Sequence, residues 1–244
     1  MKKWITFDLD GTLMQNPFKH WVFPEIDEAV AKIRPECKAV QEMVLENERR
    51  MDNHLYPSAY DWDDILNQFL KKHGIELSLN IEELVKKHSQ IPKVFLLEDG
   101  IPDVLKELKA RGFSLAVITN GFYKYQYPVM ESLGLACLFD EINTPDRVLC
   151  AKPDINMGKV LTETGTIAAH VGDRVDHDVV FANHLGAKSI LIDRHLPEDI
   201  AALPPVIRPM MLKEEWDGSK NGPPKLSMPD IVITSIKELL LLNL

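Results

Sequence analysis

The chain has 244 residues and a formal net charge of −9, from 28 Lys and Arg against 37 Asp and Glu. A chain of this length buries a sizeable core, as one large domain or two small ones. With 45% hydrophobic and 27% charged residues, its composition is that of a globular protein rather than a disordered one. The acidic balance disfavours nucleic acid or an anionic membrane as the main partner, because both attract basic surfaces.

The cysteines and the N-terminal segment bear on the compartment. Cys37, Cys137 and Cys150 are far apart and form no CxxC pair, so neither a zinc cluster nor a disulfide framework is indicated. No apolar stretch reaches the roughly 18 residues of a membrane span. Asp8 and Asp10 interrupt the N-terminal apolar run before it attains the roughly 7–15 residues of a signal-peptide core. We therefore expect a cytoplasmic protein with reduced thiols and no membrane association.

Short apolar, β-rich segments recur along the chain at wide intervals. Most are continuous runs rather than alternating ones, as in strands that are buried on both faces of a parallel sheet. Segments with helical spacing lie between several of them, and strands that alternate with helices predict a doubly wound, Rossmann-like α/β sheet. The predicted strands cover residues 4–7, 114–119, 167–171, 189–192 and 231–233.

Three helices are predicted around these strands. The segment 103–111 (DVLKELKAR) opens on Asp103, a typical N-cap residue, and stops at Gly112. The segment 178–185 ends at a glycine in the same way, and 235–242 has the pattern of a closing helix. These positions support the alternation of strands and helices.

The first two predicted strands are separated by about a hundred residues, which is too long for a simple crossover with short loops. The interval carries helical patterns instead. They cover 24–51 with a break near Pro35, 58–73 with Ser58 as a candidate N-cap, and 81–88.

This arrangement predicts a discontinuous core. Residues 16–95 would form a helical domain inserted after the first strand, and residues 1–15 and 96–244 would form the α/β core. A second unusual stretch, 196–229, holds seven prolines and is predicted to be an irregular surface excursion before the last strand.

The first strand leads directly into the sequence Asp8-Leu9-Asp10-Gly11-Thr12. Ligands of open α/β sheets bind beyond the carboxyl ends of the strands, which places both carboxylates in that crevice. An aspartate can act as a nucleophile toward phosphorus, and a second acid can protonate the leaving oxygen and later take a proton from water. The alternative is that Asp10-Gly11 only makes a turn and Asp8 is a surface acid.

Two further segments offer groups that bind phosphate. Thr119-Asn120-Gly121 ends the second predicted strand and can supply a hydroxyl and backbone N–H donors. Lys152 precedes a predicted helix that Asp154 could cap, and it could point a positive charge into the crevice. Taken in isolation, the first segment is a common turn and the lysine is a solvated surface residue.

The run 170–178 (HVGDRVDHD) ends the next predicted strand. Mg²⁺ prefers oxygen ligands from one or two carboxylates, water and substrate phosphate. Asp173 at the turn and Asp178 at the start of the following helix fit that preference. We interpret Asp176 and His177 as turn and helix-start residues.

The order of these segments carries more information than any one of them. An Asp-x-Asp-Gly-Thr strand end, a Thr-Asn-Gly strand end, a Lys-Pro pair and a Gly-Asp-x4-Asp strand end follow one another. In this the chain resembles the haloacid dehalogenase (HAD) superfamily of hydrolases. The resemblance covers residues 1–13 and about 99–195, with a closing strand at 231–233.

The resemblance implies a catalytic role for each matching residue. Asp8 would be the nucleophile, and Asp10 would be the general acid and base. Thr119 and the backbone N–H of Asn120 would hold the transferring phosphoryl group. Lys152 would neutralise the charge between the nucleophile and the phosphate.

The resemblance also implies a Mg²⁺ site formed by Asp8, the backbone carbonyl of Asp10, Asp173 and Asp178, the last bound directly or through water. The chain departs from many relatives at His177, where they carry Asn before the final Asp. This departure concerns the surroundings of the metal site rather than its ligands.

The function implied is that of a Mg²⁺-dependent phosphatase, which hydrolyses a small phosphorylated metabolite through an aspartyl-phosphate. A phosphomutase of the β-phosphoglucomutase type is the alternative, ahead of a phosphonate hydrolase, a dehalogenase or a non-catalytic binding protein. No nucleic-acid or membrane partner is expected, and a monomer and a homodimer both stay open.

The inserted helices would match the mobile cap of the family and would contain the specificity residues. The candidates have simpler interpretations as packing aromatics and solvated cations, and no role is assigned to them. They are Trp21, Arg49, Arg50, His54, Tyr60 and Trp62.

Overall fold

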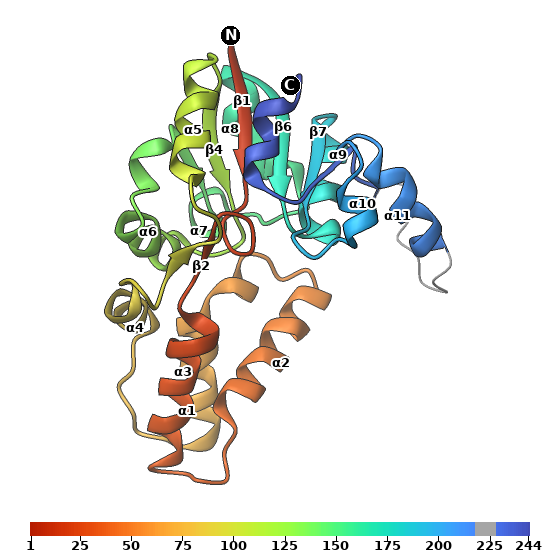
Figure 1. Ribbon diagram of the computed structural model, residues 1–244. Helices are drawn as coiled ribbons and strands as arrows, with labels where there is room; N and C mark the ends of the chain where they lie inside the picture. Colours follow the sequence, from red (N-terminus) through yellow and green to blue (C-terminus); the bar gives the residue numbers. More distant parts are fainter. Residues whose placement is uncertain (218–227) are drawn as a thin grey trace.

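The computed structural model describes residues 1–217 and 228–244. Its centre is a six-stranded sheet in the order β5-β4-β1-β6-β7-β8, and each neighbouring pair is parallel (Figure 1). All five predicted strands are present, and the structure adds the short edge strand β5. The strands are β1 (Lys2–Phe7), β4 (Ser114–Ile118), β5 (Glu141–Asn143), β6 (Gly165–Gly172), β7 (Lys188–Ile192) and β8 (Ile231–Ile233).

Helices cover both faces of this sheet. On one face, α5 (Ile101–Ala110), α6 (Tyr123–Ser132) and the 3₁₀ helix η7 (Ile236–Leu241) share a buried apolar cluster with the strands. On the other face, α8 (Lys159–Thr164) and α9 (Val180–Leu185) pack with side chains of opposite orientation from the same strands. Strands buried on both faces explain the continuous apolar runs of the sequence. The predicted doubly wound α/β fold is confirmed.

A group of helices lies beyond the carboxyl ends of the strands (Figure 1). It is joined to the sheet by two short strands, β2 (Met14–Gln15) and β3 (Phe95–Leu96), which pair antiparallel. The structure thus brings the two connecting segments together in one ribbon. The helices are α1 (Phe23–Ala31), α2 (Ala39–Asp52), α3 (Trp62–His73) and α4 (Ile81–His88).

Several helix ends differ from their predictions. Helix α5 begins at Ile101, because Gly100 adopts φ +87° and starts the helix two residues before Asp103. Helix α3 is capped by the Asp61 carboxylate, which accepts the Asp64 N–H, while Ser58 starts a separate 3₁₀ turn. In each case the N-cap is a different residue from the expected one, Gly100 for α5 and Asp61 for α3.

The excursion at 196–229 contains more structure than expected. It forms α10 (Glu198–Ala201) and α11 (Arg208–Asp217), so an entirely irregular segment was the wrong prediction. Arg208 is buried and its guanidinium binds both carboxylate oxygens of Glu238, at 2.7 and 2.9 Å. Residues 218–227 lie outside the described part of the chain. Within the described ranges, no helix is long and apolar enough to cross a membrane.

The remaining elements are short. They connect the longer helices and strands and include the short helices that follow β5 and β6. They are η1 (Phe18–Val22), η2 (Ser58–Tyr60), η3 (Ala136–Leu138), α7 (Pro145–Val148), η4 (Ile155–Gly158) and η5 (Val175–Val179).

Candidate active site

The candidate site lies at the point where the order of the sheet reverses. Strand β1 is central, with β4 on one side and β6 on the other, and chain connections leave it in both directions. Each of these three strands is followed directly by a predicted site residue, which is Asp8, Thr119 or Asp173. Parallel strands end at one edge, and a reversal of strand order opens a crevice there. Three segments that are far apart in sequence therefore meet.

Lys152 is the buried cation of this site. It is 1% exposed, and its Nζ lies 2.6 Å from Asp8 Oδ1 and 2.5 Å from Asp178 Oδ1. A charge removed from water in this way is stable only with ionic partners. Burial alone would lower the pKa of Lys152, but the charges of Asp178 and Asp8 raise it above its ordinary value. The lysine is therefore a fixed positive charge and not a solvated surface residue.

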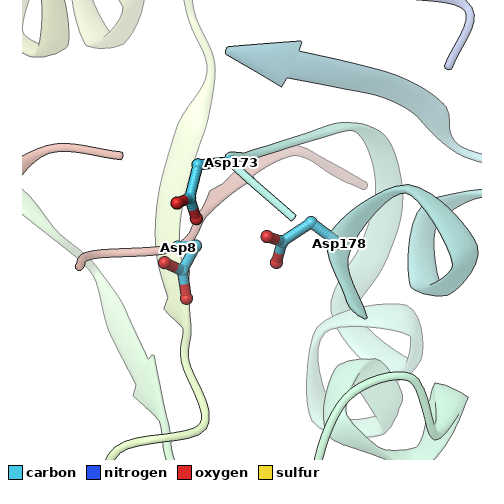
Figure 2. Close-up of side chains that lie close together, drawn as sticks. All are labelled: Asp8, Asp173 and Asp178. Carbon is cyan, nitrogen blue, oxygen red and sulfur yellow. The ribbon is translucent and has the colours of Figure 1, made fainter. Parts of the chain in front are cut away.

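Asp8, Asp173 and Asp178 form a cluster of carboxylates. Figure 2 shows the three side chains converging, and one ligand atom from each lies within 4.8 Å of the other two. Glycines make this approach possible. A Cβ at Gly11, which has φ +80°, would lie 2.2 Å from Asp173 Oδ2, and one at Gly172 would lie 2.1 Å from Asp178 Cγ.

The electrostatics of the cluster favour a cation. Burial, opposed by Lys152 and reinforced by the neighbouring acids, raises the pKa of Asp8. Loss of hydration at its carboxyl group, and then the charge of Asp178, raise the pKa of Asp173 to about 6. One lysine does not neutralise three carboxylates, so the set has an excess of oxygen ligands and negative charge. These donors fit Mg²⁺, which takes carboxylate oxygens and keeps open positions for water and phosphate.

His170 supports Asp178 from behind. The imidazole is 1% exposed and lies between Thr6 Oγ1, at 2.8 Å from Nδ1, and Asp178 Oδ1, at 3.0 Å from Nε2. Burial lowers the pKa of His170, so the neutral ring donates its Nε2–H to the carboxylate. Burial would raise the pKa of Asp178, but Lys152 and then His170 hold it below its ordinary value.

Asp10 is contacted by a helix on the face of the sheet. Its Oδ2 accepts a hydrogen bond of 2.6 Å from Gln126 Nε2 on α6. Burial raises the pKa of Asp10, and the bond from Gln126 opposes this effect. The carboxyl group is thus available as a proton carrier near Asp8, two residues away.

Asn120 joins three parts of the site. Its Oδ1 accepts the backbone N–H of Lys152 at 2.7 Å, and its Nδ2 donates to the Tyr60 hydroxyl at 2.9 Å. The same Nδ2 lies 3.4 Å from Nδ1 of the buried His177, whose pKa burial lowers to about 4. Our interpretation of His177 as a turn residue was incomplete, because the neutral ring faces the site. Asp176 does have a local role, pairing with Arg174 at 2.6 Å.

A cavity of about 300 Å³ joins the strand ends to the helices beyond them. Every predicted site residue lines it: Asp8, Asp10, Thr119, Asn120, Lys152, Asp173 and Asp178. Aromatic side chains form much of its remaining wall: Phe18, Phe23, Tyr60, Trp62 and Tyr125.

The structure sorts the unassigned candidates of the helical segment. Tyr60 and Trp62 line the cavity. Arg50 is buried between Glu46 and Asp64, with contacts of 2.8 and 2.7 Å, so it is not a solvated arginine. Arg49 and His54 are exposed, and Trp21 stacks on His88.

Sequence reasoning missed Gln126 and His170. Gln126 stands in a helix of polar and aromatic residues, and its type and spacing carry no catalytic signal. His170 stands inside a strand, two residues before Gly172, where a buried histidine is most simply a packing residue. Only the fold shows that each side chain reaches a predicted acid.

Comparison with known proteins gives consistent results. A family model described as haloacid dehalogenase-like hydrolase matches residues 2–186. The chain is 30% identical to the glyceraldehyde 3-phosphate phosphatase of Methanocaldococcus jannaschii over 215 aligned residues. This alignment covers 79% of this chain and 85% of that protein.

Two solved structures share the fold. The HAD phosphatase from Thermococcus onnurineus has a TM-score of 0.69 at 24% identity, with 98% of this chain and 96% of that chain covered. The HAD-hydrolase YfnB from Bacillus subtilis, solved bound to magnesium, has a TM-score of 0.63 at 15% identity, with the same coverage of 98% and 96%.

Proposed function

The chain belongs to the haloacid dehalogenase-like hydrolase family, and on this basis we propose that it is a Mg²⁺-dependent phosphatase for a small phosphorylated metabolite. One observation carries the proposal. A buried carboxylate, Asp8, is held by a buried lysine at the edge of a carboxylate cluster, and a second acid, Asp10, lies two residues away.

The reaction follows from these residues. A carboxylate oxygen of Asp8 attacks phosphorus, a P–O bond forms, and the P–O bond to the leaving alcohol breaks. Asp10 transfers its proton to the leaving oxygen and then takes a proton from the water that attacks the aspartyl-phosphate. Phosphate departs and Asp8 is regenerated.

Charge neutralisation and alignment supply most of the catalysis in phosphoryl transfer. Lys152 would offset charge beside the nucleophile, and Thr119 and the backbone N–H of Asn120 would bind phosphoryl oxygens. Mg²⁺, held by Asp8, the Asp10 backbone carbonyl, Asp173 and Asp178, would offset the remaining negative charge when bound.

The helices beyond the strand ends support a cap. We propose that residues 16–95 form this domain and that residues 1–15 and 96–244 form the core. The side chains that close the cavity opposite Asp8 come largely from this segment. Most of them are apolar or aromatic and the cavity volume is only about 300 Å³, which supports a substrate with a short organic part. Closure over such a site would exclude bulk water.

The rival reactions differ in the groups they need. A dehalogenase releases a halide and has no leaving alkoxide to protonate. The presence of the acid Asp10 therefore favours phosphate ester hydrolysis over dehalogenation. A phosphonate hydrolase would need a cap lysine at the site, and no lysine of the segment 16–95 lines the cavity. A phosphomutase shares the core residues, and product analysis with a sugar phosphate separates isomerised sugar phosphate from free phosphate.

The Asp8→Asn variant tests the mechanism. It should lose Mg²⁺-dependent hydrolysis of 4-nitrophenyl phosphate, because the amide is a poor nucleophile of nearly unchanged shape. Activity at the wild-type level would contradict the proposal. A screen of the purified protein with Mg²⁺ against phosphorylated metabolites, measuring released phosphate, would then identify the substrate.

The three free cysteines support the expected cytoplasmic location.

A further inference from the structure

Gln126 connects the face helix α6 to the end of the central strand. Its side chain is buried, and its Nε2 donates a hydrogen bond of 2.6 Å to Asp10 Oδ2. An amide that faces a carboxylate must present its NH₂ group, because its oxygen would repel the negative charge. Hydrogen bonds to a charged group are stronger than neutral ones. Gln126 therefore fixes one oxygen of the Asp10 carboxyl group.

The backbone leaves a passage for this amide at Gly121. A Cβ at that position would lie 2.1 Å from Nε2 and 2.8 Å from Cδ of Gln126. Any larger residue at 121 would displace the amide from its path to Asp10. The glycine that follows the Thr119-Asn120 pair thus has a role beyond making a turn.

The second oxygen of Asp10 is left without a partner. Asp10 Oδ1 is buried and accepts no hydrogen bond from the residues that the structure describes, although Asp10 and Gln126 both line the cavity. The side chain of Asn16, which also lines the cavity, approaches the Asp10 carboxyl group and, like that of Gln126, acts to lower its pKa. A buried acceptor without a partner is costly unless a ligand or water satisfies it. With Oδ2 engaged by Gln126, Oδ1 is the oxygen that remains to exchange a proton.

We propose that Gln126, with room provided by Gly121, is a positioning residue that directs Asp10 Oδ1 toward the leaving oxygen of the substrate. The inference rests on the proposed function. The bond from phosphorus to the leaving oxygen breaks, and the proton on Oδ1 moves to that oxygen. Oδ2 stays hydrogen-bonded to Gln126 throughout, so the carboxyl group does not rotate out of alignment.

The test compares esters whose leaving groups need the proton to different extents. Phenoxide is a basic leaving group that requires protonation, whereas 2,4-dinitrophenolate leaves without a proton. The Gln126→Met variant keeps the shape of the side chain and removes the donor. We expect kcat/KM for phenyl phosphate to fall about 10- to 100-fold, part of the full effect of a general acid, and that for 2,4-dinitrophenyl phosphate to fall less than about threefold. This parameter covers steps only through phosphoryl transfer to Asp8.

Three variants control the comparison. Val129→Ala loosens the same helix at a buried position and should leave the ratio of the two kcat/KM values unchanged. Asp10→Asn removes the acid and sets the largest change in that ratio. Gly121→Ala should move the ratio in the same direction as Gln126→Met. The double variant should show little further change, because both substitutions act through one amide.

The outcomes separate the inference from the function beneath it. One outcome would overturn the inference alone: the wild-type protein hydrolyses both esters, and Gln126→Met lowers kcat/KM equally for the two. Gln126 would then only support the fold. A wild-type protein that hydrolyses neither ester in Mg²⁺ would overturn the proposed function and the inference with it.

Discussion

Replacement of Lys152 by Met should destabilise the protein when no divalent cation is present. The lysine is 1% exposed and its Nζ contacts Asp8 and Asp178 at 2.6 and 2.5 Å. Each hydrogen bond to a charged group contributes about 1.5–3 kcal/mol, and removal of one member of a buried ionic set costs about 3–5 kcal/mol. We adopt about 3–5 kcal/mol, because protonation of Asp8, whose pKa is already raised, would limit the loss.

Urea unfolding in EDTA near neutral pH measures this loss, and it can be repeated with Mg²⁺. Thermal unfolding should show a decrease of roughly 6–20 °C at about 2–4 °C per kcal/mol for a chain of this size. Mg²⁺ should stabilise the variant more than the wild type, because a cation bound to the folded state alone raises stability and the variant site is more negative.

Lys124 provides a matched control. Its Nζ lies 2.6 Å from Asp63 Oδ2, a distance similar to the Lys152 contacts, but its side chain is 31% exposed. Lys124→Met should therefore cost less than Lys152→Met, because the partly exposed Lys124 is hydrated and its ion pair is screened by solvent. A loss below about 1 kcal/mol for Lys152→Met, or equal losses for the two variants, would refute the argument that burial makes the Lys152 interactions strong.

Three further substitutions have defined outcomes. Gly11→Ala would place a Cβ 2.2 Å from Asp173 Oδ2 at φ +80° and so displace that carboxylate. Calorimetry should show Mg²⁺ affinity reduced by about tenfold, as for other changes that move a metal ligand. Tyr60→Phe removes the hydroxyl that accepts an amide hydrogen bond at 2.9 Å, and kcat/KM should fall about 3- to 10-fold with the fold intact. Arg208 holds the pKa of Glu238 below its ordinary value of 4.5, against the effect of burial. Glu238→Gln should therefore cost about 1–3 kcal/mol at pH 7, and urea unfolding should show this difference shrinking as pH falls below about 4.5 and through the lower folded-state pKa. A constant difference at all pH values would contradict that assignment.

Much of the fold was predictable because it depends on local pattern. The continuous apolar runs predicted the strands, since a strand between two layers of helices has no solvent face. Gly74 and Gly186 end α3 and α9 in the left-handed conformation, as glycine at a helix end indicates. The predictions missed elements that are very short or that lie among prolines. Strand β5 has three residues, and α11 begins at a proline-rich segment.

The candidate site was predictable to the level of its motifs. The acids at the ends of β1 and β6 are marked by their spacing and by neighbouring glycines. Lys152 has no such mark by itself, and only the order of the four segments singled it out. Gln126 could not be found in this way, and Tyr60 was a candidate without a role, because each acts on a residue that lies 116 or 60 positions away.

The sequence by itself determined the alternation of strands and helices, the helical segment between the first two predicted strands, and the identity of the acids at the strand ends. These are local properties, set by the period of apolar residues and by turn chemistry. Tertiary structure alone decided which groups share a charge, which atoms are buried without partners and which side chains close the cavity. Burial and distance between distant segments control those properties, since the strength of a charge interaction depends on its surroundings. A lysine in an exposed loop would be solvated, whereas the fold buries Lys152 and makes it a fixed charge between Asp8 and Asp178.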